Sequence, residues 1–197
     1  MLKFRKQAIM FVLVLIPFIG SSQNKNEQEM RIQPEDFPQR ALQLLAHVPD
    51  NYKKIKYYKE TDNSRVSYEA KLKINRRNYS IEFDIEGNLE DIEITLRKSE
   101  LKKEVLKTVE DYLKNAYQKF YLLKIQKQYK KEPSIDEELL LEKAIKFSYL
   151  AKTNFEIIAQ VQKDGTSSKV MEFTFDYEGS LLNERTIEPS SYEHVLY

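Results

Sequence analysis

Apolar and polar residues alternate along two stretches of the chain, and each stretch runs into a glycine turn. Residues 79–89 read Tyr-Ser-Ile-Glu-Phe-Asp-Ile-Glu-Gly-Asn-Leu, and residues 171–181 read Met-Glu-Phe-Thr-Phe-Asp-Tyr-Glu-Gly-Ser-Leu. Alternation with a period of two is typical of a strand that buries one face. Glycine beside Asn or Ser tolerates the positive φ of a tight turn. Both stretches therefore predict a strand, a turn and a second strand.

Three other segments carry apolar residues at helical spacing. The first begins at Asp36 and ends before Pro49, the second begins at the N-cap Ser99, and the third follows the capping box 134–137. The remaining alternating segments predict strands over residues 52–59, 66–74, 79–85, 89–96, 121–131, 154–162, 169–177 and 181–187.

The apolar residues of the first hairpin suggest its pairing register. A turn over residues 75–78 would pair Ile74 with Tyr79 and Leu72 with Ile81. A slip by one residue would place apolar side chains opposite charged ones along the whole hairpin. In this register Lys71 lies opposite Glu82, on a face that we expect to be in water.

The two glycine turns also mark an internal repeat. Aligning Gly87 with Gly179 matches Asp84 with Asp176, and in both halves a helix precedes the strands. We predict an α+β fold in which helices pack on one face of an antiparallel sheet, built from two helix-plus-hairpin repeats. The repeats would span residues 35–98 and 99–188, with an inserted helix at 134–151 in the second and a tail at 189–197.

This order of elements resembles PepSY-like domains. The residues that carry the resemblance are Asp84-x-x-Gly87-x-Leu89 and Asp176-x-x-Gly179-x-Leu181. In tandem, the pattern is similar to exported PepSY-like proteins of Bacteroidetes, whose fold is similar to the β-lactamase-inhibitor protein. The resemblance implies a small extracytoplasmic module that binds or restrains other proteins, and it supplies no catalytic residues. The motif is short, and the inserted helix departs from a plain tandem copy.

The N-terminus carries the pattern of a secretory signal peptide. Basic residues precede the apolar run 8–19, and Gly20-Ser21-Ser22 supplies small residues for cleavage. We predict a signal peptide at residues 1–22, a flexible leader at 23–34, and an exported protein, periplasmic or extracellular, without a stable membrane anchor after cleavage. The chain has no cysteine, so disulfides and thiolate chemistry are excluded.

The charge balance and the motifs favour no catalytic site. The mature chain has 29 basic and 31 acidic residues, which gives no general attraction to nucleic acid. Glu82, Asp84 and Glu86 share one strand face and could hold a cation, but alternation alone explains them as a solvated face. No metal, cofactor or catalytic residue is expected. Arg76 and Arg77, at the hairpin tip, are the candidate partner contacts.

These features together predict a non-enzymatic exported module that engages or inhibits a protein or peptide partner in the cell envelope. An alternative is a small-ligand carrier with a pocket of the cystatin-like or NTF2-like kind, for which a lined cavity would be the evidence. A weaker alternative is a hydrolase with two converging carboxylates. Neither nucleic acid nor a cofactor is expected as a partner.

Overall fold

The computed structural model of the chain describes residues 24–49, 54–148 and 153–192. The predicted signal peptide at 1–22, the last residues of the inserted helix at 149–151 and the end of the tail at 193–197 lie outside the described residues.

The described strands form one ten-stranded sheet in the order β1-β10-β9-β8-β7-β6-β5-β4-β3-β2. Every neighbouring pair is antiparallel except β1 and β10, which are parallel. The strands are β1 (Asn24–Lys25), β2 (Glu27–Ile32), β3 (Lys56–Asp62), β4 (Arg65–Ile74), β5 (Arg77–Phe83), β6 (Leu89–Thr95), β7 (Lys119–Lys130), β8 (Thr153–Gln162), β9 (Lys169–Phe175) and β10 (Leu181–Ile187).

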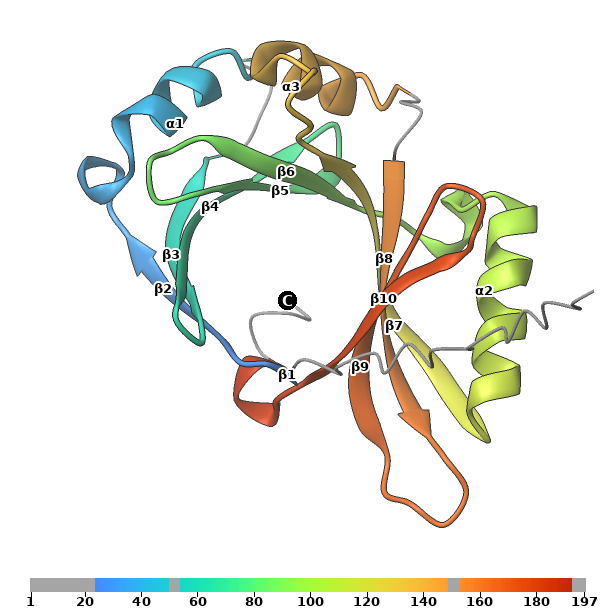
Figure 1. The fold of residues 1–197 in the computed structure, drawn as a ribbon. Helices are drawn as coiled ribbons and strands as arrows, with labels where there is room; N and C mark the ends of the chain where they lie inside the picture. The colour runs from blue at the N-terminus through green and yellow to red at the C-terminus, as the bar shows by residue number, and fades with distance from the viewer. Residues whose placement is uncertain (1–23, 50–53, 149–152, 193–197) are drawn as a thin grey trace, which may run out of the picture.

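The N-terminal segment joins the two edges of this sheet. Strand β2 pairs with β3 at one edge, β1 pairs with β10 at the other, and only Asn26 separates β1 from β2. The sheet therefore curls into a nearly closed, barrel-like shape (Figure 1), and we call its inner side the lumen. Closure leaves few unpaired strand edges, which are otherwise sites of unwanted pairing.

Two predictions about the architecture are wrong. Strands account for 47% of the structure and helices for 25%, so the fold is mostly β and not the predicted α+β arrangement of helices on a sheet face. Residues 24–32 of the predicted flexible leader form β1 and β2. The second error has a clear cause: the polar leader finds its backbone partners on β3 and β10, which are distant in sequence. The same pairing joins the two edges of the sheet into a nearly closed shape.

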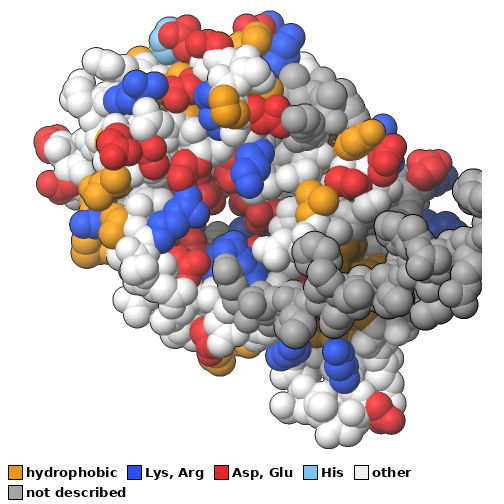
Figure 2. Space-filling view, in the orientation of Figure 1, with side chains coloured by type: hydrophobic (Ala, Val, Ile, Leu, Met, Phe, Trp, Pro, Cys, Tyr) orange, Lys and Arg blue, Asp and Glu red, His pale blue; other side chains and the backbone are white. Residues whose placement is uncertain are grey.

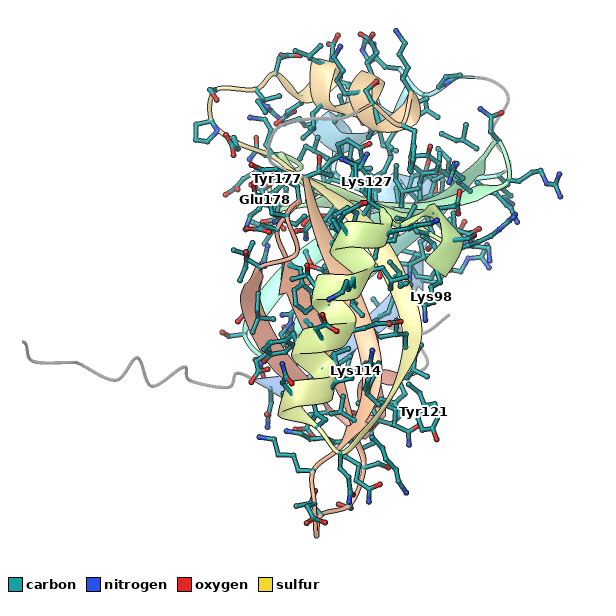
Figure 3. All side chains as sticks on the ribbon, turned by 90° about the vertical axis from the view of Figure 1, so that its right-hand side faces the viewer. Lys98, Lys114, Tyr121, Lys127, Tyr177 and Glu178 are labelled. Carbon is teal, nitrogen blue, oxygen red and sulfur yellow. The ribbon has the colours of Figure 1, made fainter. Side chains whose placement is uncertain are left out.

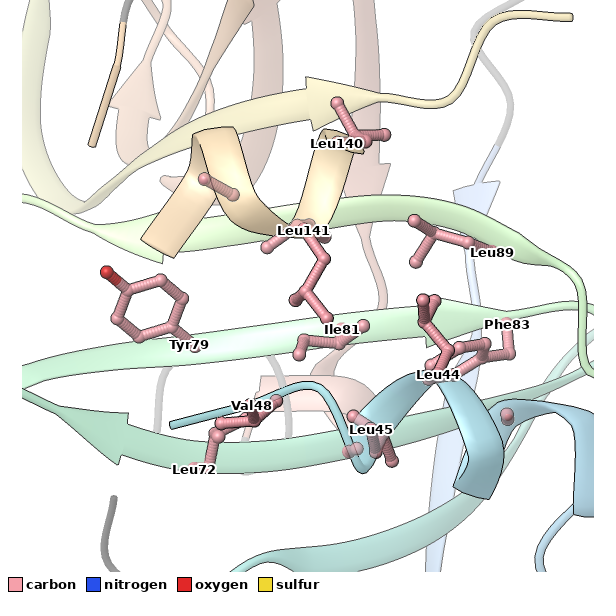
Figure 4. Packing of buried hydrophobic residues seen from close by; sticks show 14 of the residues in the cluster. Leu44, Leu45, Val48, Leu72, Tyr79, Ile81, Phe83, Leu89, Leu140 and Leu141 are labelled. Carbon is pink, nitrogen blue, oxygen red and sulfur yellow. The ribbon is translucent and has the colours of Figure 1, made fainter. Parts of the chain in front are cut away.

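Outside the sheet lie three helices, α1 (Gln39–Leu45), α2 (Lys103–Ala116) and α3 (Glu137–Ile145). Helices α1 and α3 cover β4, β5 and β6, and their buried side chains form the first hydrophobic core (Figure 4). Leu44 of α1, Leu141 of α3 and Ile81 of β5 belong to it. Helix α3 starts at an N-cap, Asp136, whose carboxylate accepts a hydrogen bond from the Leu139 amide.

A second hydrophobic core lies between α2 and strands β7, β8 and β9. Val109 and Leu113 of α2 pack with Phe173 and Phe175 of β9. In Figure 3, α2 runs along the outside of these strands, with Lys114 near its C-terminal end. None of the helices in the described ranges combines the length and the apolar character that crossing a bilayer requires.

The register of the first hairpin differs from the prediction by two residues. Leu72 pairs with Tyr79 and Ala70 with Ile81, because the turn contains only Asn75 and Arg76, both at positive φ. Such a two-residue turn matches the twist of the flanking strands. A shift of two residues keeps each side chain on its predicted face of the sheet, but it changes which residue of the partner strand lies opposite.

Candidate functional site: a charged lumen with a lysine-lined pocket

The inner face of the sheet is charged, whereas its outer face is apolar under the helices. Seven strands each contribute one glutamate to a cavity of about 30 Å³ inside the lumen. We call these residues the carboxylate ring: Glu27, Glu60, Glu69, Glu82, Glu93, Glu156 and Glu172. Three lysines also line the cavity: Lys25, Lys71 and Lys124. Figure 2 shows acidic and basic side chains around the hollow at the centre of the molecule.

On one side of the ring the carboxylates are paired with cations. The Glu172 carboxylate lies 3.0 Å from Lys25 Nζ and 2.5 Å from Arg185 Nε, with its side chain only 2% exposed. Burial by itself would raise the pKa of Glu172, but the two cations lower it to about 2. Lys25 also lies 2.9 Å from Glu27, so strand β1 is fastened to the lumen by ion pairs.

A second ion-paired group surrounds Lys71. Its Nζ lies 2.6 Å from a Glu29 oxygen and 3.0 Å from a Glu69 oxygen. The Ser80 hydroxyl donates a hydrogen bond to the other oxygen of Glu69. Burial raises the pKa of Glu69, but Lys71 and these hydrogen bonds bring it below its usual value. Lys71 therefore favours the ionised form of Glu69.

The opposite side of the ring has an excess of acidic groups. Glu69 and Glu82 are directly opposite each other on β4 and β5, and Glu82 is opposite Asp91 on β6. Burial raises the pKa of Glu82 well above its usual value, and the charges of Asp91 and Glu69 raise it further. Burial likewise raises the pKa of Glu93, with the neighbouring Glu156 adding to the effect. These acids therefore favour a bound proton or another positive charge.

Two glutamines of β7 connect the acids of β6 and β8. Gln126 donates a hydrogen bond to Glu93. Gln128 donates to an Asp91 oxygen at 3.1 Å and to a Glu156 oxygen at 2.8 Å. Burial, followed by the charge of Glu156, raises the pKa of Asp91 to about 7. The amides fix the positions of these carboxyl groups without neutralising them.

At one end of the lumen lies a larger pocket of about 670 Å³, which we call the lysine pocket. Six lysines line it: Lys54, Lys56, Lys71, Lys73, Lys98 and Lys124. Apolar residues also line it: Leu72, Tyr79, Leu96, Leu122, Leu123 and Ile125. Within the described part of the chain, Lys54, Lys56 and Lys73 form no ion pair, whereas Lys98 lies 2.6 Å from Glu110. The pocket thus combines uncompensated positive charge with apolar walls.

The two predicted partner contacts have different environments. Arg77 is engaged inside the fold, since its Nη1 lies 2.5 Å from Glu100 and its guanidinium stacks 4.2 Å above the Phe147 ring. Arg76 is exposed at the tip of the hairpin, with φ at 69°. A shallower pocket of about 420 Å³ includes both arginines and shares Asn78 and Leu96 with the lysine pocket. Arg76 is therefore the arginine available to a partner.

The two glycine turns have the same local structure. The Asp84 carboxylate accepts hydrogen bonds from the backbone amides of Glu86 and Asn88, at 2.9 and 2.8 Å. The Asp176 carboxylate accepts the equivalent bonds from Glu178 and Ser180 at the same two distances. Leu89 is buried in the first core, and Leu181 packs against the second. These residues shape turns and cores and do not face the lumen pockets, whose lining excludes them.

Each turn also packs on the helix of its own half. A Cβ on Gly87 would lie 2.8 Å from Pro38 Cβ, just before α1, and one on Gly179 would lie 3.0 Å from Thr108 Cβ in α2. Figure 3 shows Tyr177 and Glu178 beside α2. Descent of the two halves from a duplication stays a prediction.

Sequence reasoning missed the lumen residues because alternation was taken to mean a face in water. In the structure the shifted register places Lys71 opposite Ser80 and leaves Glu82 opposite Glu69. Of the three acids that the sequence grouped, only Glu82 lines the lumen cavity, while Asp84 caps a turn and Glu86 is exposed. The unused signal was the recurrence of Glu at inward positions of strand after strand.

Comparison with known proteins gives the fold alone. No protein-family model matches the sequence, and no curated protein matches it. A DUF2874 family protein from Bacteroides ovatus is similar, with a TM-score of 0.51, 12% identity, and coverage of 77% of this chain and 89% of that chain. Another from Bacteroides uniformis has a TM-score of 0.51, 10% identity, and coverage of 76% and 89%. A BLIP-like protein from Bacteroides fragilis has a TM-score of 0.49, 18% identity, and coverage of 76% and 86%.

These likenesses show that the chain has the fold of the DUF2874 structures. At 10 and 12% identity they carry no information about a ligand or a partner. The PepSY-like assignment stays a resemblance, based on the two Asp-x-x-Gly-x-Leu turns.

Proposed function

We propose that the protein is an exported, non-enzymatic binding module that holds a small acidic ligand with apolar parts in the lysine pocket. The observation that carries this proposal is the pocket itself: about 670 Å³, with six lysines and apolar walls. Small-molecule sites are typically about 300–1,000 Å³ and combine apolar walls with a few polar groups. Among the alternatives raised by the sequence, this geometry favours the ligand carrier.

The charges of the pocket define the ligand class. Lys54, Lys56 and Lys73 lack ion-pair partners among the described residues, so an acidic group supplied by a ligand would neutralise them. Lysine binds carboxylate or phosphate as a mobile point charge and imposes little geometry. Leu122 and Leu123 offer contact to an apolar chain or ring. Export and the lack of catalysis belong to the proposal, supported by the signal-peptide pattern and the missing catalytic motifs.

A fluorescence titration tests the proposal. The chain beginning at Gln23 is titrated with 1-anilinonaphthalene-8-sulfonate, an acidic apolar probe, and with its uncharged parent, N-phenyl-1-naphthylamine. We expect saturable binding of the acidic probe, weakened about tenfold or more in the variant Lys54→Gln/Lys73→Gln, because each lost charge pair contributes on the order of 1 kcal/mol. Lys107→Gln, on the far side of α2, is the control. Equal binding of both probes, or no effect of the double variant, would reject the acidic-ligand pocket.

A protein or peptide partner is the second candidate. The exposed Arg76 at the hairpin tip, next to the lysine pocket, favours it, because an acidic segment could contact both. Pull-down from the exported fraction with the wild type and with Arg76→Ala is the test. A captured protein that the variant loses supports the tip as a contact, whereas identical capture by both proteins argues against it.

A further inference from the structure

The cavity inside the carboxylate ring has too many acids for the cations around it. Seven glutamates and three lysines line a space of about 30 Å³. Lys25 is engaged with Glu27 and Glu172, and Lys71 is engaged with Glu29 and Glu69. Lys124 is the third cation, and the charge of Glu93 acts on it. The seven acids therefore share this small volume with three lysines.

Buried carboxyl oxygens in this region are poorly satisfied. Glu60 is 5% exposed, lines the cavity and shares a hydrogen bond with the carboxyl group of Glu69. One oxygen of Asp91, Oδ1, is completely buried without a hydrogen bond from the described residues. A buried acceptor without a donor costs free energy, so this oxygen points to a missing positive partner.

Three carboxylates beside this space are arranged as metal ligands. Glu82, Asp91 and Glu93 each offer an oxygen, and the three oxygens lie within 4.8 Å of one another. Glu82 and Asp91 keep a little surface toward the lumen, but protein surrounds both groups. Glu82 forms no ion pair or hydrogen bond with a described residue, while glutamines orient the other two carboxylates. The carboxylates are thus held close together although their charges repel.

We propose that Glu82, Asp91 and Glu93 form a binding site for a divalent cation of the Ca²⁺ class inside the lumen. The ligand atoms are all carboxylate oxygens, which hard cations prefer, whereas Zn²⁺ favours His and Cys. Ca²⁺ takes about six to eight oxygen ligands in flexible geometry, whereas Mg²⁺ keeps several waters and usually takes one or two carboxylates. A site with three protein carboxylates therefore suits the larger ion. Three carboxylates supply as many as six oxygens.

The proposed site is separate from the lysine pocket, since none of its three ligands lines that pocket. The two cavities adjoin, because Glu69, Lys71, Lys124 and Gln126 line both.

The experiment uses the chelator-treated chain beginning at Gln23. Calorimetric titration with CaCl₂ at pH 7.5 is expected to give one saturable site. At Ca²⁺ a hundredfold above the Kd, Tm should rise by about 5–10 °C. Glu82→Gln should raise Tm in chelator, because it relieves repulsion, and should weaken Ca²⁺ binding at least tenfold.

Glu27→Gln is the control, since Glu27 belongs to the same ring but pairs with Lys25 and is not one of the three ligands. This variant should keep the Ca²⁺-dependent rise and an affinity within about threefold of the wild type. Absence of a Ca²⁺-dependent Tm rise in the wild type would overturn the proposal. So would an equal loss of Ca²⁺ affinity in both variants, or a rise with MgCl₂ as large as with CaCl₂.

Discussion

Gly87 and Gly179 hold backbone conformations that other residues rarely adopt, with φ at 81° and 93°. At both positions a Cβ would also meet neighbouring atoms, at 2.8 Å for Gly87 and 3.0 Å for Gly179. We expect Gly87→Ala to lower the free energy of unfolding by about 2–4 kcal/mol, since it adds a collision to the cost of positive φ.

Gly165 provides a matched comparison for this effect. It has φ at 68°, but a Cβ there would meet nothing within 4 Å. Gly165→Ala should therefore lower the free energy of unfolding only by the cost of positive φ, about 1 kcal/mol. Urea denaturation of both variants measures the difference, and equal losses would show that contact with α1 contributes nothing to the Gly87 turn.

Residue chemistry explains which parts of the site the sequence could reveal. The turns around Gly87 and Gly179 are local. Asp84 and Asp176 accept hydrogen bonds from backbone amides at most four positions away, so the sequence alone indicates these turns. The role of Glu82 depends on Glu69 and Asp91, which other strands bring to it. No short-range pattern in the sequence contains that information. A row of acidic residues along a strand looks the same in the sequence whether it faces water or a lumen.

At the scale of elements, β1 is two residues long and depends on side-chain contacts to stay in the sheet. Lys25 joins it to Glu172 of β9, which is 2% exposed. Lys25→Ala removes one of two cations from a buried carboxylate, so we expect a loss of about 2–4 kcal/mol in unfolding free energy, measured by urea denaturation. Lys107→Ala, which breaks an exposed pair with Asp111, should leave the midpoint unchanged. Similar midpoints for both variants would mean that β1 does not depend on this ion pair.

The elements themselves were largely predictable, and their partners were not. Strand β4 ends at Ile74 as expected, because its alternation is complete in the sequence. Residues 24–32 carry too few apolar side chains to show a strand, and they become strands by pairing with β3 and β10. The hairpin tip shows a similar limit: positive φ at Asn75 and Arg76 gives a two-residue turn without the preferred Asn-Gly pair.

At the scale of the whole molecule, both faces of the sheet are enclosed by protein. The outer face packs on the helices in two hydrophobic cores, and the inner face gathers charged side chains around the lumen. Alternation sets which residues share a face, but it does not set which face meets the solvent. This enclosure makes the titration of inner carboxyls a property of the whole fold.

That titration gives the protein an unusual dependence on pH. Burial, with neighbouring acids, raises the pKa of Asp91 to about 7 and the pKa values of Glu60, Glu82 and Glu93 well above usual. Between pH 4 and 7 the folded state then binds more protons than the unfolded state, so stability falls as pH rises. Glu172 acts in the opposite direction: its pKa of about 2 means that its stabilisation is lost as pH falls from 4 to 2.

We therefore expect Tm in the presence of chelator to be highest near pH 4–5 and to decrease toward pH 8. Across that range the free energy of unfolding should fall by at least about 1.4 kcal/mol, which corresponds to a shift of one pKa unit in one carboxyl group. Asp91→Asn should flatten the decrease because it removes one of the groups that titrate, whereas Glu138→Gln, on the exposed surface of α3, should not change it. Calorimetric scans from pH 3 to 8 measure this dependence. A Tm that rises from pH 5 to 8 would mean that the ring is ionised and neutralised in the folded protein, and the excess of acids in the lumen would then need a different explanation.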